Sequence, residues 1–139
     1  MRGVYLLFLR IGRDSRIRVG SLGVVGFRKG LYVYVGSAQN NLEKRVRRHL
    51  SREKKLRWHI DYLTLSRVVK VVAVCAYELG REYECVIAGH LQEISEEVVD
   101  RFGSSDCSCR GHLFRVSGSV EDICGAISRR VRAKHVRLV

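Results

Sequence analysis

The most informative segment of the chain is YVGSAQNNLEKRVRRH, from Tyr34 to His49. It begins at the end of an apolar, β-rich run, residues 31–36, which is typical of a strand. The side chain of Asn40 or Asn41 can accept a hydrogen bond from a free backbone N–H and start a helix, which we predict over about residues 42–56. A strand that passes directly into a capped helix favours a fold that combines both elements.

Two basic residues lie on the wrong side of this predicted helix. At about 100° per residue, Leu42, Val46 and Leu50 share an apolar face, and Arg45 and His49 fall within or beside it. A buried guanidinium costs several kcal/mol unless it is paired, so a position of this kind indicates a partner or a ligand.

A second helix, predicted over about residues 81–95, repeats the anomaly with the opposite charge. Glu84 falls within its apolar arc, whereas Glu82 and Glu93 face away from it. An inward arginine on one helix and an inward glutamate on another are candidates for a single site.

The rest of the chain completes a mixed fold. Residues 4–9 predict a central strand, residues 16–36 an antiparallel meander of three or four strands, residues 68–77 a further strand, and residues 120–132 a last helix. We find no repeat and no linker. The expected architecture is a single α/β (α+β) domain over residues 1–139, a small antiparallel-rich sheet flanked by helices, with a basic C-terminal helix and tail at about residues 120–139.

The charge of the chain indicates a polyanionic partner. Its 139 residues carry a net charge of +12, and 20 of its 26 basic residues are arginine, whose planar fork matches phosphate oxygens. Residues 1–70 carry 17 basic and 4 acidic side chains, whereas residues 71–128 carry 4 and 10. No apolar run reaches membrane-spanning length and no signal peptide begins the chain, so we expect a soluble, cytoplasmic protein.

The cysteines suggest a second, smaller site. Five cysteines at irregular spacing weigh against a disulfide framework and leave core thiols or a metal site. Cys107, Cys109 and His112 could bind Zn²⁺ with Cys85 or Cys75 as the fourth ligand. The favoured alternative is that the loop lines a pocket while the thiols pack inside, with Cys124 in the core. The pocket would then be lined by Ser104, Ser105, Asp106 and His112.

The motifs together resemble the GIY-YIG nuclease superfamily. The matching residues are Gly3-Val4-Tyr5, Tyr34-Val35-Gly36-Ser37, Asn41-Leu42-x-x-Arg45-x-x-x-His49 and Glu84. Residues 57–62 and 102–107 further resemble an uncharacterised, mostly archaeal branch, members of which also occur fused to a base-excision DNA repair enzyme. Residues 6–33 separate the two tyrosines, a longer insertion than in most relatives, so either Tyr5 or Tyr32 could be the first tyrosine; we prefer Tyr5.

This resemblance implies a metal-dependent endonuclease that hydrolyses phosphodiester bonds in DNA and is structure-selective or repair-related. Glu84 would hold one Mg²⁺ or Mn²⁺ ion and Arg45 would bind a phosphate oxygen. Tyr34 would be the general base with Tyr5 assisting. His49 would support them and, with its lower ordinary pKa, is physically the easier base near neutrality.

Exposed basic residues would hold the nucleic-acid backbone without reading its sequence. We assign this role to Lys44, Arg47, Arg48, Arg52, Lys54, Lys55, Arg57 and the tail at residues 129–137. A possible auxiliary site comprises His59, Asp61, Ser105, Asp106, Cys107, Cys109 and His112, of which His59 and Asp61 could equally be structural hydrogen-bonding residues.

Each feature also has a purely structural interpretation. Tyr32 and Tyr34 could be ordinary sheet residues, Glu84 a carboxylate satisfied by the helix dipole, His49 a core histidine, and the basic helix a solvated surface. A non-catalytic nucleic-acid-binding module on the same scaffold, or a nuclease directed at RNA, is therefore the alternative to a DNA endonuclease.

Overall fold

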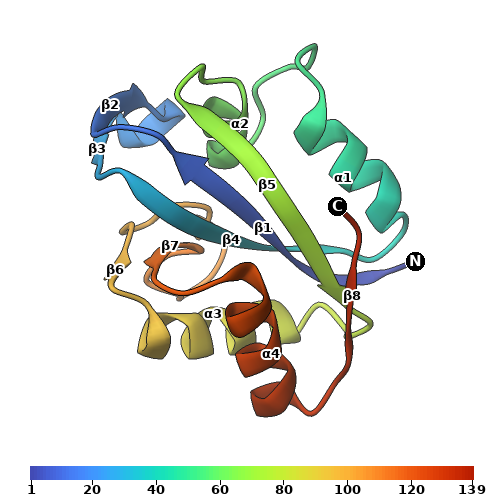
Figure 1. Cartoon of the computed structure of the whole chain (residues 1–139). Helices are drawn as coiled ribbons and strands as arrows, with labels where there is room; N and C mark the ends of the chain where they lie inside the picture. Colours follow the sequence, from blue (N-terminus) through green and yellow to red (C-terminus); the bar gives the residue numbers. More distant parts are fainter.

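A six-stranded antiparallel sheet forms the centre of the protein, in a computed structural model that describes residues 1–139 (Figure 1). Its strand order is β6-β7-β4-β1-β5-β8. The strands are β1 (Gly3–Ile11), β4 (Gly30–Ala38), β5 (Val69–Tyr77), β6 (Glu97–Val98), β7 (Leu113–Val116) and β8 (His135–Arg137). As the sequence predicts, β1 is central: it pairs with β4 on one side and β5 on the other.

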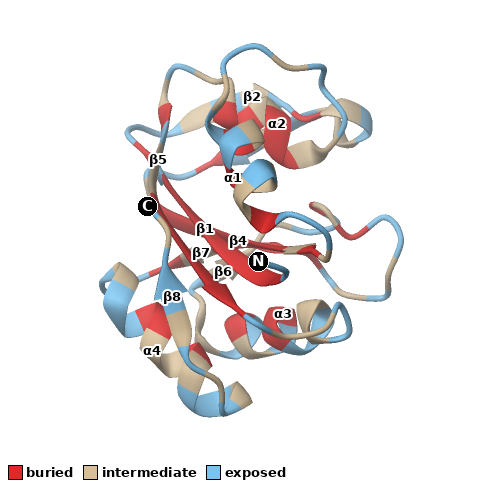
Figure 2. Cartoon of the chain, turned by 90° about the vertical axis from the view of Figure 1, so that its right-hand side faces the viewer, coloured by how far each residue is buried: buried red, intermediate tan, exposed pale blue.

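Helices cover both faces of this sheet. On the α1 face, β1 buries Tyr5, Leu7 and Leu9 under α1 (Leu42–Leu50) and α2 (His59–Thr64). On the α3 face it buries Val4, Leu6 and Phe8 under α3 (Tyr83–Ile94) and α4 (Val120–Val131). The alternation follows from the two-residue period of a strand, and Figure 2 shows the buried strands between the two helical layers. The predicted α+β class is confirmed.

The insertion between the two tyrosine strands does not extend the main sheet. Strands β2 (Ser15–Arg18) and β3 (Val24–Phe27) pair with each other in a separate two-stranded sheet, joined by a 3₁₀ turn at Gly20–Leu22. Partly buried Ile17 and Val25 pack against the core of the α1 face. The strands predicted in this insertion are present, but the predicted three- or four-stranded meander is wrong in its pairing, because only β4 joins β1.

Helix α1 begins where the sequence predicts and ends earlier. The Asn41 side chain accepts a hydrogen bond from Lys44 N–H, which fixes the start at Leu42. The chain leaves the helix at Ser51, and the Lys54 ammonium folds back to donate to the carbonyls of Arg48 and His49 at 3.1 Å. The Lys54 ammonium thus binds carbonyls of the last turn, the helix ends at Leu50, and residues 51–56 are not helical. Leu50 is consequently exposed rather than part of the apolar face.

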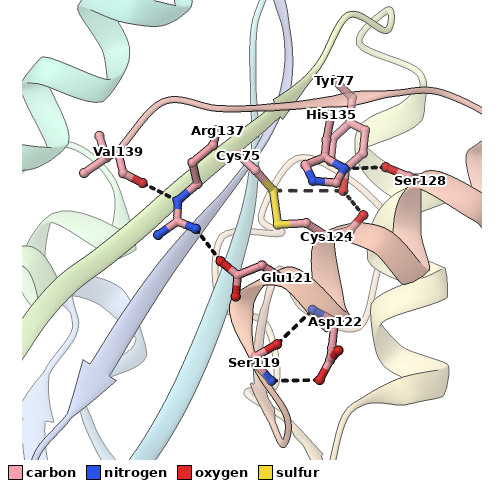
Figure 3. The surroundings of a disulfide bond; sticks show 10 residues. All are labelled: Cys75, Tyr77, Ser119, Glu121, Asp122, Cys124, Ser128, His135, Arg137 and Val139. Atoms are coloured by element: carbon pink, nitrogen blue, oxygen red, sulfur yellow. Dashed lines mark hydrogen bonds and ion pairs between the residues drawn. A yellow bond between two sulfur atoms is a disulfide. The ribbon is translucent and has the colours of Figure 1, made fainter.

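A disulfide joins the sheet to α4 on the α3 face, contrary to the sequence expectation. Cys75 on β5 and Cys124 on α4 are bonded across 49 residues, and both are fully buried (Figure 3). The Tyr77 hydroxyl, on the same strand, donates to the carbonyl of Cys124 at 2.7 Å. Sequence spacing cannot reveal this pairing because a strand and a distant helix bring the two residues together. Cys75 is therefore not available as a metal ligand.

The basic C-terminal segment is ordered rather than a free tail. Strand β8 pairs with the edge of β5, and the His135 ring is hydrogen-bonded to the Ser128 hydroxyl at 2.7 Å. Arg137 donates to Glu121, as Figure 3 shows, and Arg130 donates to Glu93. These two arginines are already paired, which corrects the expectation that the whole segment presents free charge. None of the helices has the length and apolar character that a membrane span requires.

Candidate functional site

A cleft of about 520 Å³ opens beside the C-terminal half of β4. Both helical layers contribute to it, together with the segment before α2 and the loop before β7. Its lining is mostly polar and consists of Tyr34, Gly36, Ser37, Gln39, Arg45, Arg57, Trp58, His59, Arg81, Glu84, Gly103, Ser105, Asp106 and His112.

The position of the cleft follows from the strand pairing. β7 pairs with β4 only as far as the Leu113–Tyr34 pair. One further backbone bond, from Val35 N–H to the His112 carbonyl, continues the contact. Beyond it no strand lies on that side of residues 36–38, so the polar groups of the two layers face each other there.

Tyr5 is buried beneath this cleft and is bonded to His49. Its hydroxyl lies 2.7 Å from His49 Nε2, and both residues are about 1% exposed. Tyr5 lies opposite Gly36 in the strand register. A Cβ at Gly36 would lie 2.5 Å from the tyrosine hydroxyl, so a glycine is required here by close approach. This explains the Tyr-Val-Gly motif physically.

Burial holds both members of this pair in their neutral forms. Desolvation raises the pKa of Tyr5 to about 12, although the Arg45 charge opposes the shift. Desolvation, followed by the Lys54 charge, lowers the pKa of His49 to about 3. His49 Nδ1 is the one buried side-chain polar atom without a hydrogen-bond partner. His49 does not line the cleft, contrary to the expectation that it is the easier base; it is hydrogen-bonded to Tyr5 instead.

Tyr34 is the one tyrosine that lines the cleft. It lies on the same face as Tyr5, one strand away. Its ring packs edge-on against Phe102 and close to the His49 ring. Burial raises the pKa of Tyr34 well above its ordinary value, so the hydroxyl is protonated near neutral pH.

Tyr32 belongs to another part of the molecule. Its hydroxyl donates to the Arg28 carbonyl at 2.7 Å, and its neighbours include Phe27. Of the two candidates for the first tyrosine, only Tyr5 adjoins the cleft residues.

Arg45 reaches the cleft from the first turns of α1 and is held at two points. Its Nη1 donates to the Ser37 carbonyl at 3.1 Å, and its guanidinium carbon lies 4.5 Å from the Trp58 ring centroid. A guanidinium has five N–H donors, so most of them stay available to a ligand. The unusual position of Arg45 at the border of an apolar face is thus explained by its place in the cleft.

Glu84 enters the same cleft from the first turn of α3. It continues the buried stripe of Ile87, Ala88 and Leu91, and its side chain is 23% exposed. Burial, followed by the negative charge of Asp106, raises the pKa of Glu84. Asp106 also lines the cleft, 3.8 Å from the exposed Arg81. Two carboxylates therefore line one cleft, that of Glu84 partly desolvated and that of Asp106 exposed.

These carboxylates suit a hard divalent cation. Mg²⁺ and Mn²⁺ prefer carboxylate and water oxygens, and a cation would compensate for the burial and the Asp106 charge that raise the pKa of Glu84. The donor set therefore fits the ion that the family resemblance implies, with Glu84 and Asp106 as the residues that would hold it.

The expected auxiliary site is divided by the structure. His59 lines the cleft, and its Nδ1 accepts the Gly103 N–H at 2.8 Å. Burial lowers its pKa, so the ring is neutral and Nε2 carries the proton as a donor. Ser105, Asp106 and His112 also line the cleft.

Asp61, by contrast, is a structural residue. It is fully buried and accepts two hydrogen bonds from Arg48, at 2.8 and 2.9 Å, and others from the Arg57 and Trp58 N–H groups. Although burial opposes ionisation, these bonds lower the pKa of Asp61. This network fixes the segment that carries Trp58 and His59 into the cleft.

The predicted basic surface is only partly free. Lys54 is 3% exposed at its side chain and bonds to the Thr64 hydroxyl at 2.6 Å, so it cannot reach a phosphate. Arg48 is paired with Asp61, and Arg52 donates to the carbonyls of Thr64 and Leu65. Basic side chains with neither an ion pair nor a side-chain hydrogen bond remain exposed around α1 and its C-terminal loop. They are Lys44, Arg47, Lys55 and Arg57.

A second set of ligands lies against the cleft wall. Cys85, Cys107, Cys109 and His112 place one ligand atom each within 4.8 Å of one another, a set that could hold a metal ion. The expectation that these thiols pack in the interior is wrong, and Cys85 rather than Cys75 completes the set. Sequence reasoning had also passed over Gln39 and Arg81, whose spacing gives no signal because separate loops bring them to the cleft.

Comparisons with known proteins give one match. The family described as "Domain of unknown function DUF123" matches residues 4–135, and this family is GIY-YIG-like. Neither the curated proteins nor the solved structures give a match.

Proposed function

The chain belongs to the DUF123 family, and we propose that it is a metal-dependent endonuclease that hydrolyses phosphodiester bonds in DNA. One observation carries this proposal. Tyr34 of β4, Arg45 of α1 and Glu84 of α3 come from three elements and line a single cleft. Phosphodiester hydrolysis needs a phosphate-binding cation, a group that handles the proton of water, and a site for a metal ion.

Arg45 binds the scissile phosphate. The Ser37 carbonyl and the Trp58 ring hold the guanidinium in place, so little side-chain freedom is lost when a phosphate oxygen arrives. Its charge is permanent at working pH. His59, with Nε2–H directed from a ring fixed by Gly103, is a neutral donor for a second oxygen.

Glu84 and Asp106 hold the divalent cation. When bound, Mg²⁺ or Mn²⁺ supplies positive charge that polarises the phosphate and favours deprotonation of a nearby hydroxyl. Of the two carboxylates, Glu84 is the more fixed, because it is half-buried on a helix, whereas Asp106 is 73% exposed on a loop.

Tyr34 handles the proton of the attacking water. Its hydroxyl is protonated at rest and first acts as a hydrogen-bond donor and acceptor that orients the water. To act as a base it must first release its own proton to the solvent in the cleft; burial opposes that release most strongly, and the Arg45 charge favours it. Tyr5, which is hydrogen-bonded to His49, supports Tyr34 from the adjacent strand β1.

DNA in a branched or damaged form is the proposed substrate. Lys44, Arg47, Lys55 and Arg57 would neutralise backbone phosphates beside the cleft and give the strong salt dependence typical of such contacts.

Binding without cleavage is the second candidate function. It is favoured by the state of the three predicted bases: burial raises the pKa of Tyr5 and Tyr34, which keeps both protonated near neutral pH, and His49 does not line the cleft. A module that only binds nucleic acid would use the same basic residues.

The test is a cleavage panel with Mg²⁺ or Mn²⁺. Supercoiled, flapped, branched and abasic DNA and a structured RNA are incubated with wild type, Glu84→Gln and Glu82→Gln. Glu82 is an exposed residue at the start of α3 and controls for the loss of one negative charge there. We expect cleavage of at least one DNA by wild type and Glu82→Gln, and none by Glu84→Gln. Binding by all three proteins without a product that depends on Glu84 would support the binding module instead.

A further inference from the structure

We propose that Cys85, Cys107, Cys109 and His112 bind one structural Zn²⁺ ion that fastens the loop before β7 to α3. The four ligand atoms lie within 4.8 Å of one another although they come from two segments more than twenty residues apart in sequence. This site adjoins the carboxylates of the cleft through His112 and uses ligands of a different chemical class.

The distance between Cys107 Sγ and His112 Nε2 fits a tetrahedral zinc ion. With Zn–S of about 2.3 Å and Zn–N of about 2.0 to 2.1 Å, tetrahedral geometry places sulfur and nitrogen about 3.5 Å apart. Cys107 Sγ and His112 Nε2 are 3.5 Å apart. Two thiols in the same geometry lie about 3.8 Å apart, within the 4.8 Å limit of the cluster. Small rotations of exposed or half-buried cysteine side chains would therefore complete the site.

The donor set selects zinc and a structural role. Three thiolates and one imidazole are soft to intermediate ligands, which suit Zn²⁺ and not Mg²⁺. Four protein ligands fill the tetrahedral coordination shell and leave no position for water or substrate, the arrangement of structural zinc sites. The three cysteines are also the only ones outside the Cys75–Cys124 disulfide.

The loop is held by backbone turns and by the buried Phe102 rather than by regular secondary structure. Residues 99–112 contain no helix or strand. Their backbone contacts include Arg101 N–H to the Arg110 carbonyl and His112 N–H to the Phe102 carbonyl. This loop nevertheless supplies Gly103, Ser105, Asp106 and His112 to the cleft. A metal crosslink to Cys85 would tie the loop to α3 and restrict the motion of that wall of the cleft.

His112 connects the zinc site to the cleft. It is about 1% exposed, its Nε2 faces Cys107, and its Nδ1 lies 3.7 Å from Glu84 Oε2. When Nε2 ligates zinc, Nδ1 carries the proton and faces the carboxylate, the arrangement in which a carboxylate orients a metal-bound histidine. The zinc would thereby help to position Glu84, a consequence that rests on the proposed nuclease function.

The zinc itself is tested by metal analysis, which needs no nuclease activity. Full-length protein purified under reducing conditions from zinc-supplemented cells should contain one zinc per chain. The variant Cys107→Ser/Cys109→Ser should contain less than a tenth of that amount. Ser108→Ala, an exposed residue between the two ligands, is the matched control and should keep its zinc. Zinc-free wild type, or equal zinc in the double variant, would overturn the proposal.

A spectroscopic titration covers the case in which the double variant does not fold. Wild type stripped with a chelator and titrated with Co²⁺ should develop thiolate-to-cobalt charge-transfer absorption that saturates at one equivalent and is abolished by one equivalent of Zn²⁺. The melting temperature should rise when zinc is restored. Absence of the thiolate band, or a disulfide among these three cysteines in the reduced protein, would contradict the site.

The link to Glu84 is read from the Mg²⁺ dependence of cleavage. In Cys109→Ser we expect the Mg²⁺ concentration for half-maximal cleavage to rise several-fold while DNA binding is retained. An unchanged Mg²⁺ dependence would show that zinc only fastens the loop. Absence of cleavage by every protein would refute the nuclease proposal and leave the zinc result standing.

Discussion

The two faces of the sheet differ in what they bury. Helices α3 and α4 contribute only apolar side chains and Cys124 to the interior of the α3 face. Helices α1 and α2 bury His49, Asp61 and Thr64 in the α1 face, and the adjoining strands add the Tyr5 hydroxyl. The α3 face also holds the Tyr77 hydroxyl and the disulfide, so the same strands separate a mostly hydrophobic core from a layer with more buried polar groups.

This difference indicates where stability and where chemistry reside. Buried polar groups add less to stability than apolar groups of similar volume and are costly when unpaired, as His49 Nδ1 is. Their concentration next to the cleft is explained if they position Tyr34 and Arg45. Glu84 is the exception that joins the two layers, since it lies on α3 but reaches past the sheet into the cleft.

Substitutions at two adjacent residues of β1 are the strongest test of the difference between the two faces. Leu6 is buried in the α3 face, and Leu7 is buried in the α1 face opposite Tyr34. Either leucine changed to alanine should lower the free energy of unfolding by about 2 to 5 kcal/mol in a denaturant titration. Leu6→Ala should cleave at the wild-type rate per folded molecule, and Leu7→Ala more slowly. Equal cleavage rates would remove the distinction between the faces.

Removal of the phosphate-binding cation tests the α1 face directly. Arg45→Ala should reduce the single-turnover cleavage rate by about 10² to 10³-fold, the typical effect of losing one group that stabilises developing charge. Its melting temperature should stay close to that of the wild type. Arg47→Ala, an exposed arginine on the same helix, should lose no more than about threefold, as expected for one surface phosphate contact. A comparable loss in both variants would mean that Arg45 acts only as surface charge.

A glycine substitution tests the close approach under the cleft. Gly36→Ala places a methyl group against the Tyr5 hydroxyl, so it should destabilise the protein by about 1 to 3 kcal/mol and lower cleavage. Gly26→Ala on β3 meets no atom within 4 Å and is the control, which should leave both thermal unfolding and cleavage unchanged. A stable, active Gly36→Ala variant would contradict the packing of Tyr5.

The pH dependence of stability is a further test of the α1 face, with a smaller expected effect. The pKa of His49 is lowered to about 3 in the folded protein, so the unfolded chain binds the proton first as the pH falls below 6.5. Stability is therefore present above pH 6.5 and is lost on acidification, by up to about 1.4 kcal/mol per pH unit.

Denaturant titrations between pH 7 and 5 measure this slope. His49→Gln should show a slope smaller by about one proton. His59 and His112, whose pKa values burial also lowers, contribute in the same direction to both proteins. An identical slope in the variant would show that His49 titrates normally.

Helical periodicity was sufficient to identify Arg45 and Glu84 as inward residues, because the arc that each helix presents to the sheet follows from 3.6 residues per turn. It could not locate the end of α1, which depends on the Lys54 cap from outside the helix. The sequence also predicted Lys54 as a phosphate ligand, whereas its side chain is buried beside Asp61.

Contacts between distant segments were beyond the reach of sequence spacing. The Cys75–Cys124 disulfide and the contribution of Cys85 to the metal cluster both depend on how strands and helices are packed. The same holds for the separate β2–β3 sheet, since local alternation predicts strands but not their partners.

The most direct test of the central claim separates binding from cleavage in Glu84→Gln. On the best DNA of the panel, the dissociation constant and the single-turnover cleavage rate are measured in Mg²⁺ for this variant and for wild type. We expect the dissociation constant to change by less than about threefold, because backbone phosphates supply the affinity. Cleavage should fall by at least about 10²-fold. Cleavage by Glu84→Gln at the wild-type rate would contradict the assignment of this cleft as the site of hydrolysis.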